Sequence, residues 1–138
     1  GKRVVIIGGG LVGAELAEFL MERDRKVTVL EEGDKLALEM AHPRRWRVLG
    51  DLRDHGVALV TGARDIEIGA DSVTWSTDEG DAGAAADTVV IAQLVDGDLG
   101  VAEAFTEAGF EPMVIGDAGG VGYLEGAIHA GWHTAAAF

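Results

Sequence analysis

A glycine-rich segment near the start of the chain constrains the fold more strongly than any other part of the sequence. Residues 3–7 (Arg-Val-Val-Ile-Ile) form a short β-branched run, which predicts a strand buried on both faces. The segment Gly8-Gly9-Gly10-Leu11-Val12-Gly13 follows at once, and apolar residues then recur at helical spacing as far as Asp24. A strand, a glycine turn and a helix in this order predict the first unit of a parallel α/β sheet.

The rest of the chain alternates between short apolar runs and amphipathic segments. We expect further strands at residues 27–30, 57–60, 88–92 and 113–116, and helices at residues 42–55, 99–108 and 123–138. Short segments between turn residues predict an antiparallel meander at 64–68, 72–76 and 82–86. Right-handed crossovers then give a doubly wound, Rossmann-like α/β fold. Its mainly parallel sheet has the expected order 3-2-1-4-5, with the meander inserted before the fourth strand.

The spacing of Gly8, Gly10 and Gly13 between a strand and a helix is typical of a dinucleotide-binding turn. Gly8 permits the tight turn, Gly10 lets the backbone approach a pyrophosphate, and Gly13 allows the helix to pack closely on the strand. Free N–H groups and the positive dipole end of the helix bind phosphates without any Lys or Arg. We therefore expect the pyrophosphate to contact the whole turn, namely Gly8, Gly9, Gly10, Leu11, Val12 and Gly13.

An acidic residue at the end of the second strand predicts which dinucleotide binds. Glu31 lies 18 residues beyond Gly13, close to the spacing expected of the ribose-binding acid. A carboxylate there accepts both adenosine ribose hydroxyls and repels a 2′-phosphate, and no Arg follows it in Glu32-Gly33-Asp34. We therefore expect NAD(H), or another unphosphorylated adenosine ligand, rather than NADP(H). Glu32 is the alternative ribose partner.

Charge and composition exclude several classes of function. The chain of 138 residues has 24 acidic and 11 basic residues, and its net charge is −13. Residues 70–138 contain no Lys or Arg, so we expect neither a nucleic-acid partner nor an anionic membrane surface. With no Cys, the chain has no disulfide, thiolate nucleophile or cysteine-ligated cluster, which fits a reducing, cytoplasmic location. No apolar run is long enough to span a bilayer.

Other polar clusters point to no catalytic or metal-binding side chain. Glu125, His129 and His133 follow one another at helical spacing, but a stripe of this kind without a further ligand favours a surface face over a metal site. The basic, aromatic segment 44–47 favours a solvated helix face, with docking on an acidic neighbour as the alternative. No Ser–His–Asp arrangement is present, so a bound cofactor would have to supply any redox chemistry.

Four segments resemble a known family. Residues 8–17 (Gly-Gly-Gly-Leu-Val-Gly-Ala-Glu-Leu-Ala) resemble the NAD-binding domain of flavoproteins that carry two dinucleotide folds. The segment 38–54 narrows the resemblance to the trimethylamine dehydrogenase, histamine dehydrogenase and 2,4-dienoyl-CoA reductase family. Residues 114–118 (Val-Ile-Gly-Asp-Ala) and 125–128 are similar to its closing motif. The resemblance implies that Asp117 lies near the flavin of a neighbouring FAD or ADP domain.

The same resemblance implies a longer parent protein, with a barrel that holds FMN and an iron–sulfur cluster and a fold that binds FAD or ADP. Residues 1–138 then form a single dinucleotide-binding domain, with an NAD-binding core at 1–95 and a segment at 96–138 that returns to the absent FAD domain. A first residue Gly1 also fits a fragment. Met113–Gly116 is expected to join this chain's own sheet instead, and a homodimer or domain swap stays open.

One departure from the family affects the nicotinamide end. After residues 89–92 the family continues with Thr-Gly beside the cofactor, where Ala92 would contact it, whereas here the sequence is Gln93-Leu94. The leading hypothesis is an NAD(H)-binding domain that passes hydride to flavin in its parent and does not turn over alone. The alternative is a structural or interaction module with a vestigial or ADP-only site. A free-standing enzyme would need a catalytic residue that the sequence does not reveal.

Overall fold

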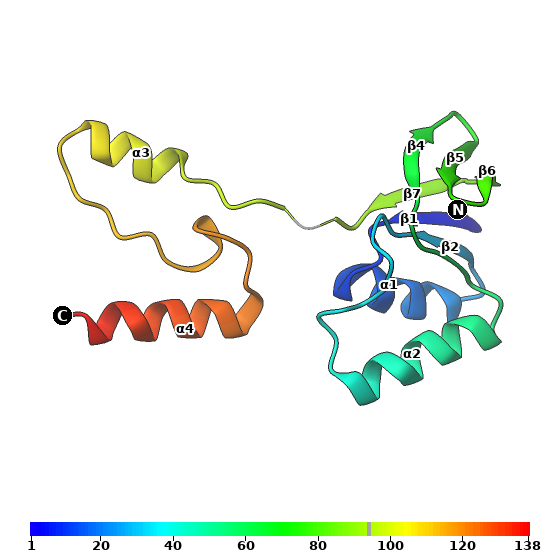
Figure 1. Ribbon diagram of the computed structural model, residues 1–138, viewed down its shortest axis with the longest axis horizontal. Helices are drawn as coiled ribbons and strands as arrows, with labels where there is room; N and C mark the ends of the chain where they lie inside the picture. The colour runs from blue at the N-terminus through cyan, green and yellow to red at the C-terminus, as the bar shows by residue number, and fades with distance from the viewer. Residues whose placement is uncertain (94) are drawn as a thin grey trace. The chain divides into compact units, whose positions relative to one another are not determined.

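The computed structural model describes residues 1–93 and 95–138 (Figure 1). Contacts between Cα atoms divide the chain into two compact units, residues 1–93 and 94–138. The boundary falls two residues before the division expected from the sequence. We refer to them as unit 1 and unit 2.

Unit 1 is built on a four-stranded parallel sheet. Its strands are β1 (Arg3–Ile7), β2 (Lys26–Leu30), β3 (Ala58–Val60) and β7 (Thr88–Ile91), in the order β3-β2-β1-β7. Val4 lies between Val27 of β2 and Thr88 of β7, so β1 occupies an inner position. Residues 4–7 of β1 are all buried, as the β-branched run predicts for a strand covered on both faces. The strand β7 is the fourth strand expected for this sheet, so the order 3-2-1-4 is confirmed.

Two helices cover one face of this sheet. They are α1 (Leu11–Met21) and α2 (His42–Asp54), which lie on the same side of the strands in Figure 1. Pro43 stands in the first turn of α2, where its fixed φ angle favours helix initiation. The core on this side joins β1 and β2 to the helices through Ile6, Ala17 and Leu52, none of which is exposed.

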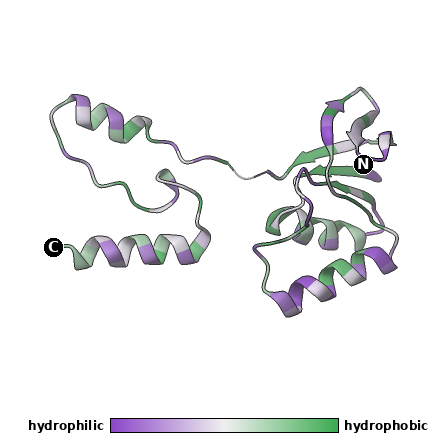
Figure 2. Ribbon diagram, viewed as in Figure 1, coloured by the Kyte–Doolittle hydropathy of each residue, from purple (hydrophilic) through white to green (hydrophobic). Residues whose placement is uncertain are grey.

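An antiparallel meander covers the other face. It consists of β4 (Arg64–Ile68), β5 (Ser72–Thr77) and β6 (Gly80–Ala85), which lie between β3 and β7 in the sequence, as predicted. Val73 and Trp75 of β5 pack with Val5 and Ile7 of β1. Figure 2 shows the hydrophobic strands of the parallel sheet between these two layers.

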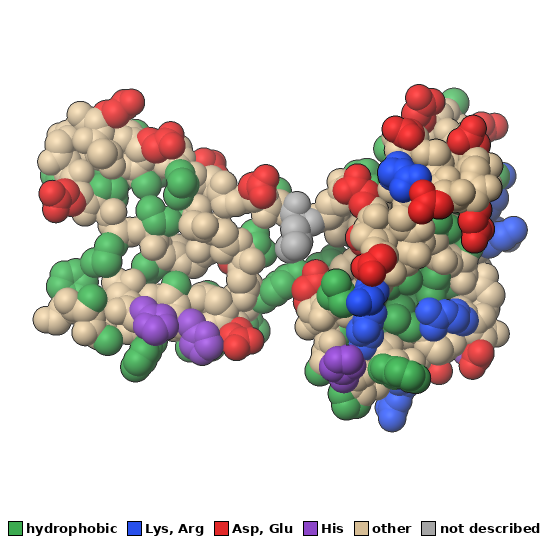
Figure 3. Space-filling view, in the orientation of Figure 1, with side chains coloured by type: hydrophobic (Ala, Val, Ile, Leu, Met, Phe, Trp, Pro, Cys, Tyr) green, Lys and Arg blue, Asp and Glu red, His purple; other side chains and the backbone are tan. Residues whose placement is uncertain are grey.

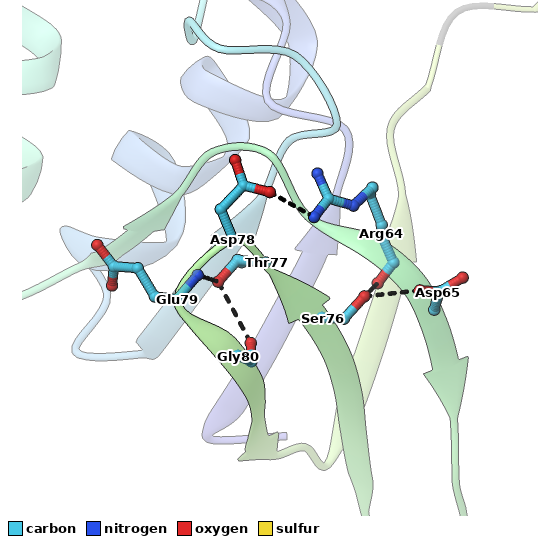
Figure 4. Close-up of polar contacts among 7 residues, drawn as sticks. All are labelled: Arg64, Asp65, Ser76, Thr77, Asp78, Glu79 and Gly80. Carbon is cyan, nitrogen blue, oxygen red and sulfur yellow. Dashed lines mark hydrogen bonds and ion pairs between the residues drawn. The ribbon is translucent and has the colours of Figure 1, made fainter.

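Short polar contacts join the start of β4 to the end of β5 and the β5–β6 turn (Figure 4). The guanidinium of Arg64 donates to Asp78 over 2.7 Å, and the hydroxyl of Ser76 donates to Asp65 over 2.7 Å. Thr77 accepts a hydrogen bond from the N–H of Glu79 in the β5–β6 turn. These residues belong to the meander alone, so we assign them a local structural role.

Unit 2 contains α3 (Gly100–Glu107), the 3₁₀ turn η1 (Gly116–Ala118) and α4 (Tyr123–Ala136). The expectation that Met113–Gly116 forms a fifth strand is wrong: residues 113–115 are not in a strand, and Gly116 begins η1. A strand needs a partner for its backbone hydrogen bonds, and the described part of unit 2 has no strand to provide one. Within the described residues, the parallel sheet therefore ends at β7.

None of the described residues of unit 2 is buried. Large apolar side chains are instead exposed on both helices and the segment between them, including Val101, Phe105, Ile115, Leu124 and Trp132. Phe105 and Phe110 contact each other edge to face beside α3, but this pair does not form a core. In the described part of the chain, no helix has the length and hydrophobicity that crossing a membrane requires.

Candidate dinucleotide-binding site

The turn between β1 and α1 leaves no space for side chains at two of its glycines. Gly8 has a φ angle of 106°, which favours glycine, and a Cβ there would lie 2.7 Å from the carbonyl carbon of Ala92. A Cβ on Gly13 would lie 1.9 Å from the carbonyl oxygen of Gly8. The roles predicted for these glycines, a tight turn and close packing of helix on strand, agree with this geometry.

Backbone hydrogen bonds hold the turn at the carboxyl edge of the sheet. The N–H of Gly8 donates to the carbonyl of Leu30 over 2.8 Å, and the N–H of Ala92 donates to the carbonyl of Ile7 over 2.7 Å. The turn therefore lies between the ends of β2 and β7. In open α/β sheets, ligands bind outside this edge.

The first turn of α1 presents backbone N–H groups without intrahelical partners. The N–H of Ala14 donates to the carbonyl of Gly10 over 3.0 Å, which makes it the first intrahelical donor, so the N–H groups of Leu11, Val12 and Gly13 precede the helical pattern. Gly10, the N-cap residue, has no side chain to satisfy them. Together with the helix dipole, these donors fit a phosphate group.

Glu31 lies at the end of β2 beside the turn, as predicted. Its Oε2 accepts a hydrogen bond from the N–H of Gly9 over 2.7 Å, and its Oε1 accepts one from the N–H of Gly33 over 2.8 Å. These contacts hold the carboxylate at the edge of the glycine turn, where a ribose-binding acid belongs. Glu32 is exposed.

A third acid at this turn was not predicted. Oε2 of Glu39 accepts a hydrogen bond from the N–H of Leu11 over 3.1 Å. The contact arises because the segment after β2 folds back over the turn, where the N–H of Ala37 donates to the carbonyl of Gly9 over 2.7 Å. Leu36 and Met40, which lie three residues before and one residue after Glu39, are buried in the core. These two apolar residues are the local signal that the segment packs against the rest of unit 1.

The other predicted site residues fall in different places. Ala92 is half-buried beside Gly8, and Gln93 is exposed, whereas Leu94 lies outside the described residues. Asp117 belongs to η1 of unit 2, where its carboxylate accepts a hydrogen bond from the N–H of Gly122 over 3.3 Å. The structure therefore groups the glycine turn, Glu31 and Ala92 in unit 1, and Asp117 is a residue of unit 2.

Much of the basic segment of α2 is engaged by its neighbours. Arg44 pairs with Glu15 at 3.4 Å and with Glu18 at 3.1 Å, and Arg45 donates to the carbonyl of Leu36 over 2.7 Å. Trp46 is 77% exposed. Two of the three arginines thus join α2 to α1 and to the segment after β2.

Figure 3 shows several acidic side chains over the meander, and basic side chains occur on unit 1 alone. The second of these facts follows from the sequence, in which Arg64 is the last basic residue. In unit 2, His133 packs edge to face against Trp132. Among the described residues, no three His, Cys, Asp or Glu side chains gather closely enough to hold a metal ion.

The fold and the glycine turn define the protein as an α/β protein with a candidate dinucleotide site at the carboxyl edge of its parallel sheet. The sequence model of the pyridine nucleotide-disulphide oxidoreductase family matches residues 1–109. The chain therefore belongs to that family, whose members use flavin and NAD(P) cofactors.

Two curated relatives are much longer than this chain. A bilirubin reductase from Mediterraneibacter gnavus is 36% identical over 115 residues, which cover 83% of this chain and 18% of the relative. An NADH oxidase from Thermoanaerobacter brockii is 30% identical over 136 residues, which cover 97% of this chain and 21% of the relative. The chain thus spans about a fifth of the length of these relatives.

Solved structures show the same relationship. A 2-naphthoyl-CoA reductase in complex with 2-naphthoyl-CoA is 34% identical, with a TM-score of 0.81 over 96% of this chain and 20% of that one. An NAD-dependent persulfide reductase from A. fulgidus is 34% identical, with a TM-score of 0.59 over 75% of this chain and 19% of that one. The chain is similar to one portion of each of these larger enzymes.

Proposed function

We propose that unit 1 binds NAD(H) as one domain of a larger flavin-dependent oxidoreductase. The observation that carries this proposal is the glycine turn itself. Its backbone is too closely packed for side chains at Gly8 and Gly13, and the N-cap residue Gly10 gives the first N–H groups of α1 no side-chain cap. No cationic side chain is needed to bind a pyrophosphate in such a turn.

Each group at the turn has a separate role in this proposal. The N–H groups of Leu11, Val12 and Gly13 donate to the pyrophosphate, and the missing side chain of Gly10 lets it approach. Glu31 accepts the adenosine ribose hydroxyls, with Glu32 as the alternative acceptor. Ala92, beside Gly8, leaves space toward the nicotinamide end. When bound, NADH supplies a hydride for a flavin that another part of the parent protein holds.

The preference for NAD(H) over NADP(H) follows from charge. The Glu31 carboxylate would lie against a 2′-phosphate and repel it, and the next three residues, Glu32-Gly33-Asp34, offer no cation to compensate. The whole chain carries a net charge of −13, which adds to the repulsion.

The parent protein supplies the remaining parts. We propose that it is a cytoplasmic flavoprotein of the trimethylamine dehydrogenase and 2,4-dienoyl-CoA reductase type, with an FAD- or ADP-binding domain and a barrel. The exposed apolar side chains of unit 2 would be covered by that FAD-binding domain, and Asp117 would lie near its flavin. Two observations support this: unit 2 has no buried residue among those described, and the chain spans about a fifth of its relatives.

Isothermal titration calorimetry of the 138-residue chain with NADH and with NADPH tests the proposal. We expect NADH to bind more tightly, and Gly10→Val and Glu31→Ala each to weaken NADH binding by about tenfold or more, or about 1.4 kcal/mol. Asp34→Ala, at a side chain that is 85% exposed, is the matched control for charge and should change affinity little. A larger loss of affinity in Glu32→Ala than in Glu31→Ala would identify Glu32 as the ribose acceptor. Tighter binding of NADPH would overturn the NAD(H) assignment.

Comparison of NADH with ADP tests the alternative of an adenosine-only site, which the exposed Gln93 after Ala92 favours. Equal affinities would mean that the nicotinamide end contributes nothing, and the ADP-only site would replace the proposal. Indifference of both ligands to Gly10→Val would instead favour a scaffold whose turn holds no ligand.

A further inference from the structure

We propose that Glu39 is an internal competitor that limits dinucleotide affinity by occupying the anion site at the start of α1. This inference rests on the proposed function. The carboxylate of Glu39 accepts a hydrogen bond from the N–H of Leu11 over 3.1 Å, and that N–H is one of the donors assigned above to the pyrophosphate. The N–H of Leu11 cannot form a linear hydrogen bond to Glu39 and to a phosphate oxygen at the same time. Binding of the pyrophosphate therefore requires the Glu39 carboxylate to leave.

The start of α1 has no acid of its own. The N-cap residue Gly10 forms no side-chain cap, and the first turn contains no Asp or Glu. The first acid along the helix, Glu15, pairs with Arg44. A carboxylate from 28 residues further along the chain therefore supplies the negative charge that a helix N-terminus favours.

The fold fixes the backbone of Glu39 but not its side chain. Ala37, two residues before Glu39, and Met40, directly after it, are buried, at 1% and 6% exposure, and the N–H of Met40 donates to the carbonyl of Ala37 over 3.1 Å. Arg45 holds the same segment through the carbonyl of Leu36. Glu39 itself is exposed, so its carboxylate can rotate into solvent while the backbone stays in place.

A Cβ on Gly10 would lie 3.0 Å from Oε1 of Glu39, so the carboxylate lies directly over the N-cap residue. In the proposed complex, the pyrophosphate approaches the backbone at this same residue. A carboxylate that stayed nearby would also repel the phosphates, so displacement removes both steric overlap and like charge.

Two acids at one turn should therefore have opposite effects. Glu31 also accepts a backbone N–H, from Gly9, but its carboxylate is needed for the ribose hydroxyls. Removing the charge of Glu31 should weaken NADH binding, whereas removing that of Glu39 should strengthen it. A general decrease in negative charge would move both in the same direction, so the opposite signs separate competition from bulk electrostatics.

The test compares Glu39→Gln with Asp34→Asn, a matched control in the same segment whose side chain is 85% exposed. Calorimetry with NADH and with ADP, at one ionic strength, should show about two- to fivefold lower Kd for Glu39→Gln, as expected for loss of a charged group at a helix N-terminus. Asp34→Asn should change Kd by much less. Equal gains in the two variants, or no gain in Glu39→Gln while the wild type binds, would overturn the proposal.

A ligand-free measurement keeps the inference separate from the proposed function. In ¹H–¹⁵N spectra, the amide of Leu11 should shift between wild type and Glu39→Gln, and should not shift in Asp34→Asn. An unchanged Leu11 amide would show that the contact does not form, and would overturn the inference whatever binds. If neither nucleotide binds any variant, the proposed function fails, and the role of Glu39 as a competitor fails with it.

Discussion

The carbonyl oxygen of Gly8 occupies the place where a side chain at position 13 would begin: a Cβ on Gly13 would lie 1.9 Å from it. The contact joins the first residue of the glycine turn to the first turn of α1. It involves a backbone atom of Gly8, which cannot rotate away as a side chain can. Position 13 therefore fixes how closely α1 packs on β1.

Gly13→Ala should be among the most destabilising single substitutions in unit 1. The added methyl group forces the helix and strand apart, and overpacking of this kind costs about 1–3 kcal/mol or more. Urea denaturation of both proteins measures the change in the free energy of unfolding. An unchanged unfolding midpoint would mean that the turn is looser than the structure shows.

Gly50→Ala is the matched control, since it is the same substitution in a helix. A Cβ on Gly50 of α2 would meet nothing within 4 Å. Alanine has the higher helix propensity, so this variant should gain about 0.5–1 kcal/mol. Opposite signs for the two variants would show that close packing, and not glycine as such, determines the effect at Gly13.

Asp87→Asn should reduce stability at neutral pH, and this reduction should disappear in acid. Asp87 accepts hydrogen bonds from the side chain of Arg3 and from the N–H groups of Arg3 and Lys2, which hold the pKa of its carboxyl well below the usual range. Because the pKa is lower in the folded state, the charged pair stabilises the fold above the ordinary carboxyl pKa and ceases to do so as pH falls through the folded-state value.

Thermal melts of wild type and Asp87→Asn across a pH series check this prediction. The difference in Tm should be full at neutral pH and should narrow as the pH falls below about 4. Asp34→Asn, at an exposed position, should show no comparable difference. A gap that widened in acid would contradict the sign of the linkage.

Arg44→Ala should have a small effect, although Arg44 pairs with two acids of α1. The side chain of Arg44 is 52% exposed, and those of Glu15 and Glu18 are 50% and 26% exposed, so water still reaches both pairs and screens the attraction. Exposed pairs of this kind contribute about 0–1 kcal/mol, and less at high salt. Denaturation at low and high salt measures both effects, and a loss above about 2 kcal/mol would contradict the prediction.

The parallel sheet of unit 1 could be predicted because β1 and β2, its inner strands, are short and mostly β-branched runs whose last four residues are buried. β1 was expected at residues 3–7 and is found there, and the other strands of the sheet differ by one residue at an end. Met113–Gly116 shows the limit of this reasoning. An apolar run indicates that a segment needs to be buried, but it does not identify the strand or domain that buries it.

The candidate site could be predicted in part for a similar reason. Gly8, Gly13 and Glu31 follow a local spacing that the strand–turn–helix unit imposes, so their positions can be derived from sequence. Glu39 follows no such spacing. Its contact with Leu11 depends on the path of the segment after β2, which is determined by where Leu36 and Met40 become buried.

The absence of buried residues from the described part of unit 2 has a consequence for hydrogen exchange. Amide protection requires structure that opens rarely, and helices with no buried side chain open at little cost in free energy. In the 138-residue chain, the amides of α3 and α4 should therefore exchange far faster than those of β1. If another domain or protein covers these helices, their amides should exchange more slowly. The residues whose exchange slows would then identify the covered surface.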